Sequence, residues 1–194
     1  MALRIALIQG HPDPAGNHLD HALADAYAHG AEAAGHRIDH LQVAALDFPL
    51  LRSQAEFDHG QPPAAIRQAQ STLAAADHWV IVFPLWLGTT PALLKAFLEQ
   101  VMRPGFAFAG AGDQARGGLL KGKSARVVVT MGMPALLYRT YFRAHGVRYL
   151  ERGVLRFAGM RPVRTSLFGL VEARSDRTRQ RWLVRMERLG RRGR

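Results

Sequence analysis

The chain has 194 residues, of which 48% are hydrophobic and 21% are charged, so it is long enough to form one globular domain with a full core. It contains no cysteine, which excludes a disulfide scaffold, a zinc–cysteine site and catalysis by a thiolate. No apolar run reaches the length of a membrane span, and the first residues lack the pattern of a signal peptide. We therefore expect a cytoplasmic protein with a single domain over residues 1–194 and no metal ligands.

The formal net charge of +11 comes mainly from arginine, because lysine occurs only at Lys95, Lys121 and Lys123. We attribute this composition first to a genome that favours arginine codons. The alternative is a surface that binds a polyanion, since an arginine-rich tail covers residues 174–194. Four of its arginines share one helical face: Arg177, Arg181, Arg185 and Arg188. No helix-turn-helix, zinc-finger or ribonucleoprotein pattern is present, so we expect no nucleic-acid partner.

Apolar runs of strand length alternate along the chain with runs of helical periodicity. Five strands are predicted, at residues 4–9, 36–41, 78–83, 125–130 and 163–170. Helices are predicted at 18–34, 64–76, 91–102 and 176–189, with further helix inside 134–159. Few regular signals appear in 44–63 and 103–123.

This alternation predicts an α/β protein with a flavodoxin-like three-layer αβα sandwich and a five-stranded parallel sheet of order 2-1-3-4-5. A six-stranded dinucleotide-binding fold is a poor fit, because no G-x-G-x-x-G follows the first strand. In the favoured fold, ligands bind beyond the carboxyl ends of the strands, where three loops of this chain carry suitable residues.

The loop after the first strand leads into the start of a helix. Free backbone N–H groups and the helix dipole favour a phosphate at such a position. Asn17 is the candidate N-cap, and His18 can add a further donor. The alternative is a capped helix without a ligand.

The loop after the third strand belongs to the most informative segment, Phe83-Pro84-Leu85-Trp86-Leu87-Gly88-Thr89-Thr90-Pro91. A strand that stops at one proline and enters a helix at the next makes a stiff apolar ledge, and a flat aromatic cofactor is its expected occupant. Trp86 can stack on a ring, and the N–H groups of residues 85–88 can reach its polar edge. The alternative places Trp86 in the core or in an oligomer contact.

The loop after the fourth strand contains Gly132, which allows a close backbone approach or a positive φ. Tyr138 and His145 follow, about two helical turns apart, which would bring them near one face. A phenol and an imidazole there can stabilise developing negative charge. The alternative is ordinary packing for the tyrosine and a capping role for the histidine.

Taken together, these segments resemble the flavodoxin-like NAD(P)H:quinone oxidoreductases, the DT-diaphorase family. The shorter bacterial branch is the most similar, with its modulators of drug activity and ancillary oxidoreductases of potassium-efflux systems. The resemblance spans nearly the whole chain and is carried by His11-Pro12-x-Pro14, the segment 83–95, the segment 103–108 and Thr130-Met131-Gly132.

The resemblance implies which residues hold a flavin. It assigns the flavin phosphate to His11, Asn17, His18, Leu19 and Asp20. It assigns the isoalloxazine ring to Pro84, Leu85, Trp86, Leu87 and Gly88. It assigns the pyrimidine edge of the ring to Thr130, Met131, Gly132 and Met133. The charge-stabilising tyrosine of the family matches Tyr138, and its histidine partner matches His145 with a spacing that differs by a residue from the mammalian pattern.

The implied cofactor is FMN, with FAD as the alternative, because the long C-terminal extension of the mammalian members is absent. A second departure is Met131-Gly132-Met133, where many relatives have two glycines. The implied reaction is a ping-pong transfer of hydride from NADPH or NADH to a quinone or another flat aromatic acceptor. Family members are usually homodimers, and residues 106–108 and 138–155 are the candidate interface.

Other functions remain open at this stage. A regulatory flavoprotein subunit of a potassium-efflux system would have a peripheral membrane partner and would use the basic tail. An azoreductase or FMN reductase would differ only in the acceptor. A flavodoxin-like electron carrier is disfavoured, because such carriers are usually acidic and this chain is basic.

Overall fold

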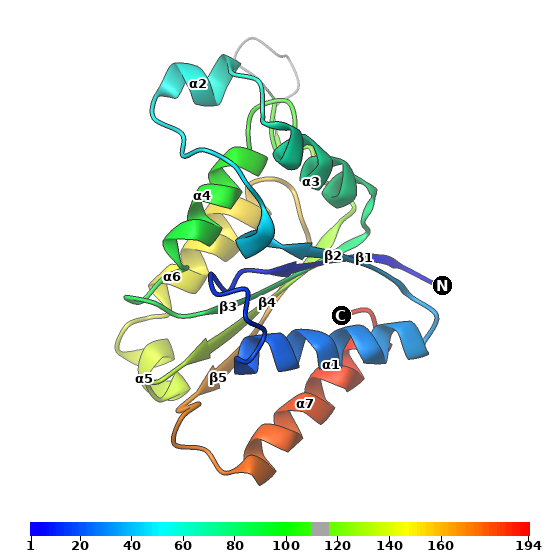
Figure 1. The fold of residues 1–194 in the computed structure, drawn as a ribbon, viewed down its shortest axis with the longest axis vertical. Helices are drawn as coiled ribbons and strands as arrows, with labels where there is room; N and C mark the ends of the chain where they lie inside the picture. Colours follow the sequence, from blue (N-terminus) through cyan, green and yellow to red (C-terminus); the bar gives the residue numbers. More distant parts are fainter. Residues whose placement is uncertain (110–116) are drawn as a thin grey trace.

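The computed structural model describes residues 1–109 and 117–194. A single parallel sheet of five strands has the order β2-β1-β3-β4-β5, which confirms the predicted topology (Figure 1). The strands are β1 Arg4–Gln9, β2 Arg37–Gln42, β3 His78–Pro84, β4 Ser124–Met131 and β5 Val163–Gly169. The central strands are buried along their length because helices cover both faces, which explains their continuous apolar sequence.

Helices form a layer on each side of the sheet (Figure 1). One layer contains α1 Leu19–Ala33 and α7 Asp176–Arg191. The other contains α3 Ala64–Ala75, α4 Ala92–Val101, α5 Ala135–Thr140 and α6 His145–Arg148. The predicted long helices are confirmed to within a residue or two at each end. Each layer has its own hydrophobic cluster against the sheet, so the structure is a three-layer sandwich.

The segment 44–63 was expected to be irregular, and this is wrong in part. A short helix, α2, covers Gln54–His59, and a 3₁₀ turn covers Val43–Ala45. The Ser53 hydroxyl accepts the N–H of Glu56, while the Glu56 carboxylate accepts the N–H of Arg52. This pairing is close to a capping box, and the Ser-x-x-Glu spacing was visible in the sequence. Of the predicted irregular segment 103–123, residues 110–116 lie outside the described residues.

The helical segment within 134–159 is divided into three pieces. After α5 the chain passes through Arg143 and Ala144, whose φ angles are +52° and +48°. These left-handed residues end one helix and turn the chain into α6, which leads directly into a π-helical stretch, Tyr149–Arg156.

Helices α1 and α7 cross in close backbone contact. A Cβ on Gly30 would lie 2.0 Å from the Glu187 carbonyl oxygen, and one on Gly190 would lie 2.0 Å from the Tyr27 carbonyl oxygen. Glycine is therefore required on both sides of the crossing.

Candidate functional site

The three loops predicted to carry chemistry meet at the carboxyl end of the sheet. The Leu85 N–H donates to the Thr130 carbonyl at 2.8 Å, which joins the second loop to the third. The Thr130 hydroxyl lies 2.9 and 3.0 Å from the two carboxylate oxygens of Asp20, which joins the third loop to the first. The rings of His11 and Trp86 lie edge to face, 6.2 Å apart, which joins the first loop to the second.

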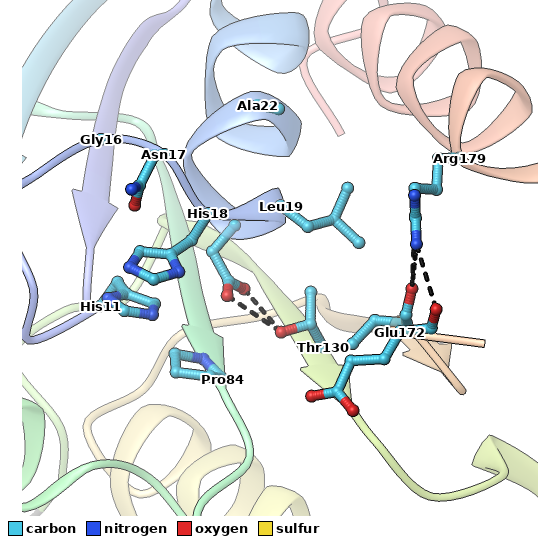
Figure 2. A pocket seen from close by; sticks show the side chains of 12 residues that line it. His11, Gly16, Asn17, His18, Leu19, Ala22, Pro84, Thr130, Glu172 and Arg179 are labelled. Atoms are coloured by element: carbon cyan, nitrogen blue, oxygen red, sulfur yellow. Dashed lines mark hydrogen bonds between the residues drawn. The ribbon is translucent and has the colours of Figure 1, made fainter. Parts of the chain in front are cut away.

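A cavity of about 640 Å³ opens beside the start of α1 (Figure 2). Seven of the predicted cofactor residues line it: His11, Asn17, His18, Leu19, Asp20, Pro84 and Thr130. Gly16, Ala22, Val171, Glu172 and Arg179 complete the lining and were not predicted. The carboxyl end of β5 reaches the same edge of the sheet as those of β1, β3 and β4, so the segment after β5 also contributes to the cavity.

The N-cap of α1 is His18, so the assignment of Asn17 to that position is wrong. His18 makes no side-chain capping bond; its Nε2 lies 2.8 Å from an Asp13 carboxylate oxygen. Its ring stacks on His11 with centroids 4.0 Å apart. Helix geometry leaves the first N–H groups of α1 without intrahelical acceptors, so this end of the cavity can bind an anion.

Charge near the start of α1 depends strongly on protonation. Burial and the neighbouring His18 and His21 rings lower the pKa of His11. Burial raises the pKa of Asp20 to about 6, although the Thr130 hydroxyl and His18 favour its ionised form. Below that pH, this end of the cavity gains protons on Asp20 and carries less negative charge toward an anionic ligand.

The ledge after β3 is a tight turn. Trp86 and Thr89 exchange backbone hydrogen bonds of 3.0 Å, and between them Leu87 and Gly88 have φ angles of +48° and +82°. Two positive φ angles in a two-residue loop are typical of a type I′ turn. Leu87 is fully exposed and Trp86 is 49% exposed, so the turn presents apolar surface to solvent.

Not every N–H group of the ledge is free for a ligand, contrary to expectation. Those of Leu85 and Trp86 donate to the Thr130 and Thr89 carbonyls, respectively. The side chain of Leu85 packs on the core. The surface left for a flat ring consists of the Trp86 and Leu87 side chains and the backbone of Gly88.

Tyr138 and His145 are close, but they belong to separate helices and not to two turns of one helix. Their ring centroids lie 6.2 Å apart. The Tyr138 ring is fully buried, and its hydroxyl donates to the Gly88 carbonyl at 3.1 Å and accepts the Val147 N–H at 3.2 Å. Burial also raises the pKa of Tyr138. This hydroxyl therefore holds the ledge against the start of α6.

His145 lies beside the same turn. A Cβ on Gly88 would lie 3.0 Å from His145 Nε2, while His145 Nδ1 lies 3.1 Å from the Phe142 carbonyl oxygen. The next residue, Gly146, packs so closely that a Cβ there would lie 2.3 Å from the Gly88 carbonyl oxygen. Of the predicted catalytic pair, His145 is the one whose ring nitrogen adjoins the ledge.

The turn after β4 contributes backbone more than side chains. Met131 is buried in the core, and its carbonyl accepts the Val171 N–H. The Met133 carbonyl accepts the Leu170 N–H. Gly132 has no positive φ, and a Cβ there would meet open space, so neither the positive φ nor the close backbone approach suggested for it occurs within the described part of the chain. Met131, Gly132 and Met133 lie outside the lining of the cavity.

Arg179 closes the far side of the cavity (Figure 2). Its guanidinium donates to the carbonyls of Val171 and Glu172 at 3.2 Å and pairs with Asp176 at 2.8 Å. It therefore fixes the loop between β5 and α7, which forms one wall.

A family model described as a flavodoxin-like fold matches residues 3–189. The chain belongs to this flavodoxin-like family. It is 32% identical over 133 residues to an FMN-dependent NADH:quinone oxidoreductase of Ruegeria pomeroyi, covering 61% of this chain and 65% of that one. It is 45% identical over 65 residues to the glutathione-regulated potassium-efflux system ancillary protein KefG of Escherichia coli, covering 32% of this chain and 33% of that one. The matches thus span less than two thirds of each relative's length.

Among solved structures, an NAD(P)H:quinone oxidoreductase from Methanothermobacter marburgensis superposes with a TM-score of 0.83, covering 98% of this chain and 96% of that one. Because the two sequences are 22% identical, this similarity supports the fold alone. Within residues 1–109 and 117–194, no helix is both long and apolar enough to cross a membrane. The same residues contain no cluster of histidine, aspartate or glutamate suited to a metal ion.

Proposed function

We propose that this protein is an FMN-dependent NAD(P)H:quinone oxidoreductase. The observation that carries the proposal is the junction of an anion-binding helix start with an exposed apolar ledge, at the carboxyl end of β1 and β3. The similarity to the FMN-dependent NADH:quinone oxidoreductase supports the same assignment. FMN is favoured over FAD because Arg179, the one arginine or lysine among the described residues that line the cavity, is already engaged by the protein and is not free for a second phosphate.

The residues present fit a flavin mononucleotide. The N–H groups at the start of α1, with His18 and Asn17, would hold the phosphate. Trp86, Leu87 and the backbone of Gly88 would hold the ring. A bound flavin would accept hydride from NADPH or NADH and pass it to a quinone or a similar flat acceptor.

The chain itself supplies position and electrostatics. Tyr138 keeps the Gly88 carbonyl in place, and the Thr130 carbonyl fixes the first residue of the ledge. The Nε2 atom of His145 lies beside Gly88. There it can donate a hydrogen bond to a ligand on the ledge, which would stabilise negative charge that develops on that ligand. The apolar side chains of the ledge exclude water from one face of the acceptor site.

A homodimer is part of the proposal. Exposed apolar side chains gather around the ledge and α5: Leu87, Leu136, Leu137, Tyr141 and Phe142. Such a patch is typical of an interface. The other candidate segment, 106–108, is used within the chain, because Phe106 stacks on Trp79 and Ala107 is fully buried. Sedimentation of the protein is expected to show a dimer, and a monomer at micromolar concentration would remove this part of the proposal.

The test of the proposed activity is the visible spectrum of protein reconstituted with FMN under anaerobic conditions. Addition of NADPH is expected to bleach the flavin bands, and a benzoquinone is expected to restore them. The FMN affinity of His18→Ala, measured by flavin fluorescence, is expected to fall with the loss of the phosphate contact. A protein that takes up neither FMN nor FAD would refute the assignment.

A second candidate function is regulation of a potassium-efflux system, which the similarity to the ancillary protein supports over a third of the chain. It predicts flavin uptake with negligible quinone turnover and retention of the protein on membranes that contain such a channel. Quinone reduction by the reconstituted protein without any membrane binding would exclude it.

A further inference from the structure

A second cavity, of about 680 Å³, lies away from the flavin site and follows the edge of the sheet. Its lining includes Thr165 and Leu167 of β5, the last strand of the sheet. Arg139 of α5 and Arg148 of α6 line one side, and Arg185 of α7 lines the other. Because α5 and α6 pack on one face of the sheet and α7 on the opposite face, the cavity straddles the free edge of β5. We call it the edge groove.

The charge of the edge groove is strongly positive. Arg139, Arg148 and Arg185 form no ion pair with any residue in the described part of the chain. The Arg185 guanidinium lies 5.6 Å from the centre of the Phe168 ring, which orients it without neutralising it. Glu151 is the single acidic residue of the lining, and it is paired with Arg156 at 2.5 Å.

A third cavity, of about 530 Å³, continues the positive surface along α7 and shares Arg185 with the edge groove. Arg177, Arg181 and Arg188 line it, together with Gln180 and Val184. The arginine face of α7 is therefore continuous with the edge of the sheet. From the sequence alone, this face could be explained either by codon usage or by anion binding.

The position of the groove restricts its occupant. An edge strand presents unpaired backbone N–H and C=O groups, and an extended peptide can pair with them as an added strand. Arginines on both sides of that line select a peptide with acidic side chains on both of its faces, because successive side chains of a strand alternate. Thr165 and Leu167 offer small and apolar contacts between the charges.

Other occupants fit less well. A second copy of this chain, which we expect to pack on the apolar patch that includes Leu136 of the groove lining, carries the same net charge of +11 and presents no acidic run to the arginines. Single-stranded nucleic acid is usually bound on aromatic stacking platforms, and none of the residues lining these two cavities is aromatic. A lipid surface is flat, whereas Arg139, Arg148 and Arg185 surround a concavity.

We propose that the edge groove binds an acidic segment of a partner protein, which adds to the sheet as a sixth strand beside β5. The site is separate from the flavin cavity, so the proposal does not depend on the cofactor.

The probe is a fluorescent, end-blocked peptide of about eight residues, a typical strand length, with the repeat Glu-Glu-Val-Val, which places glutamates on both faces of the strand. The test variant is the triple substitution Arg139→Gln, Arg148→Gln and Arg185→Gln. The control is the triple substitution Arg52→Gln, Arg67→Gln and Arg161→Gln, which removes the same charge at residues outside both cavities. Binding is measured by fluorescence anisotropy with and without FMN.

Wild-type and control proteins are expected to bind the peptide, and the test variant is expected to bind about tenfold more weakly. Replacing alternate valines by proline, which removes backbone donors, is expected to abolish binding, and hydrogen exchange at β5 is expected to slow when the glutamate–valine peptide is bound. Equal weakening in both triple variants would overturn the edge groove as the binding site. Equal binding of the proline peptide would overturn strand addition. Binding of oligothymidylate or of phosphatidylglycerol vesicles, but not of the peptide, would overturn the choice of partner.

Discussion

The two ends of the candidate flavin site are built differently. The end at α1 consists of polar side chains, with His11, His18 and Asp20 close together; burial lowers the pKa of His11 and raises that of Asp20. The ledge end consists of apolar side chains on a turn that backbone groups and one buried tyrosine hydroxyl hold in place. The α1 end should therefore respond to pH and charge, and the ledge to shape.

The largest effect is expected for the shape of the ledge. Gly146→Ala would place a methyl group 2.3 Å from the Gly88 carbonyl oxygen, so the turn or α6 must move. We expect a loss of about 3–4 kcal/mol in the free energy of unfolding and a large loss of FMN affinity. Denaturant titration and flavin fluorescence measure the two effects.

Gly153→Ala is the matched control for that prediction. A Cβ on Gly153 would meet only the Tyr149 ring, at 3.5 Å, which is an ordinary contact. This variant is expected to be neutral or slightly more stable, because alanine favours helical backbone. Equal destabilisation by the two substitutions would show that the ledge is not held by the close approach of Gly146.

The next effect concerns charge at the α1 end. The pKa of Asp20 rises from 3.8 to about 6 on folding, so the folded protein binds more protons than the unfolded chain between those values. Stability then falls as the pH rises through this window. Asp20→Asn keeps an acceptor for the Thr130 hydroxyl and removes the ionisation, and is expected to be more stable by up to about 3 kcal/mol at pH 7.

Urea titrations at pH 4 and pH 7 measure this difference, which is expected to be close to zero at pH 4. Asp25→Asn is the control, since Asp25 is exposed on the same helix. A pH-independent difference between Asp20→Asn and the wild type would show that burial does not hinder ionisation of Asp20.

A smaller effect is expected at the hydroxyl that holds the ledge. Tyr138→Phe leaves the Gly88 carbonyl and the Val147 N–H without their partner and is expected to cost about 1–2 kcal/mol of stability. FMN binding is expected to weaken while the rate of flavin reduction at saturating FMN changes little. For His145→Gln we expect the opposite pattern, with little change in FMN binding and slower flavin reduction. If Tyr138→Phe left the stability unchanged but slowed flavin reduction, the tyrosine would act directly in catalysis and not by holding the ledge.

The smallest effect is expected at Leu87, whose φ of +48° is costly for a residue with a side chain. Leu87→Gly is expected to stabilise the protein by about 1 kcal/mol without cofactor and to weaken FMN binding by removing apolar surface. Thermal unfolding with and without FMN separates the two effects. Destabilisation without cofactor would mean that the Leu87 side chain stabilises the fold itself.

The sheet order and the convergence of three loops were predictable from the sequence. Apolar runs and turn residues indicate the strands and helices, and a parallel sheet brings the carboxyl ends of its strands to one edge. The short helix α2 was also within reach, through Ser53 and Glu56. The contacts of Tyr138 were not, because they depend on the left-handed residues Arg143 and Ala144, neither of which is a type that signals such a turn.

The wall of the candidate flavin cavity formed by Arg179 and Glu172 was missed for a different reason. Arg179 was one of many arginines in a basic tail, and composition alone gave it no distinct role. Only the packing of α7 beside α1 brings it to the edge of the sheet where β5 ends.

The glycine crossing of α1 and α7 has a consequence for regulation. Gly30 and Gly190 leave no space between the two backbones, so a displacement of α7 is passed to α1 without a compressible layer of side chains. Helix α1 carries one end of the candidate flavin site, and α7 carries Arg185 of the edge groove. If occupancy of the groove moves α7, the two sites are thermodynamically linked. Cofactor and partner would then change each other's affinity by the same factor.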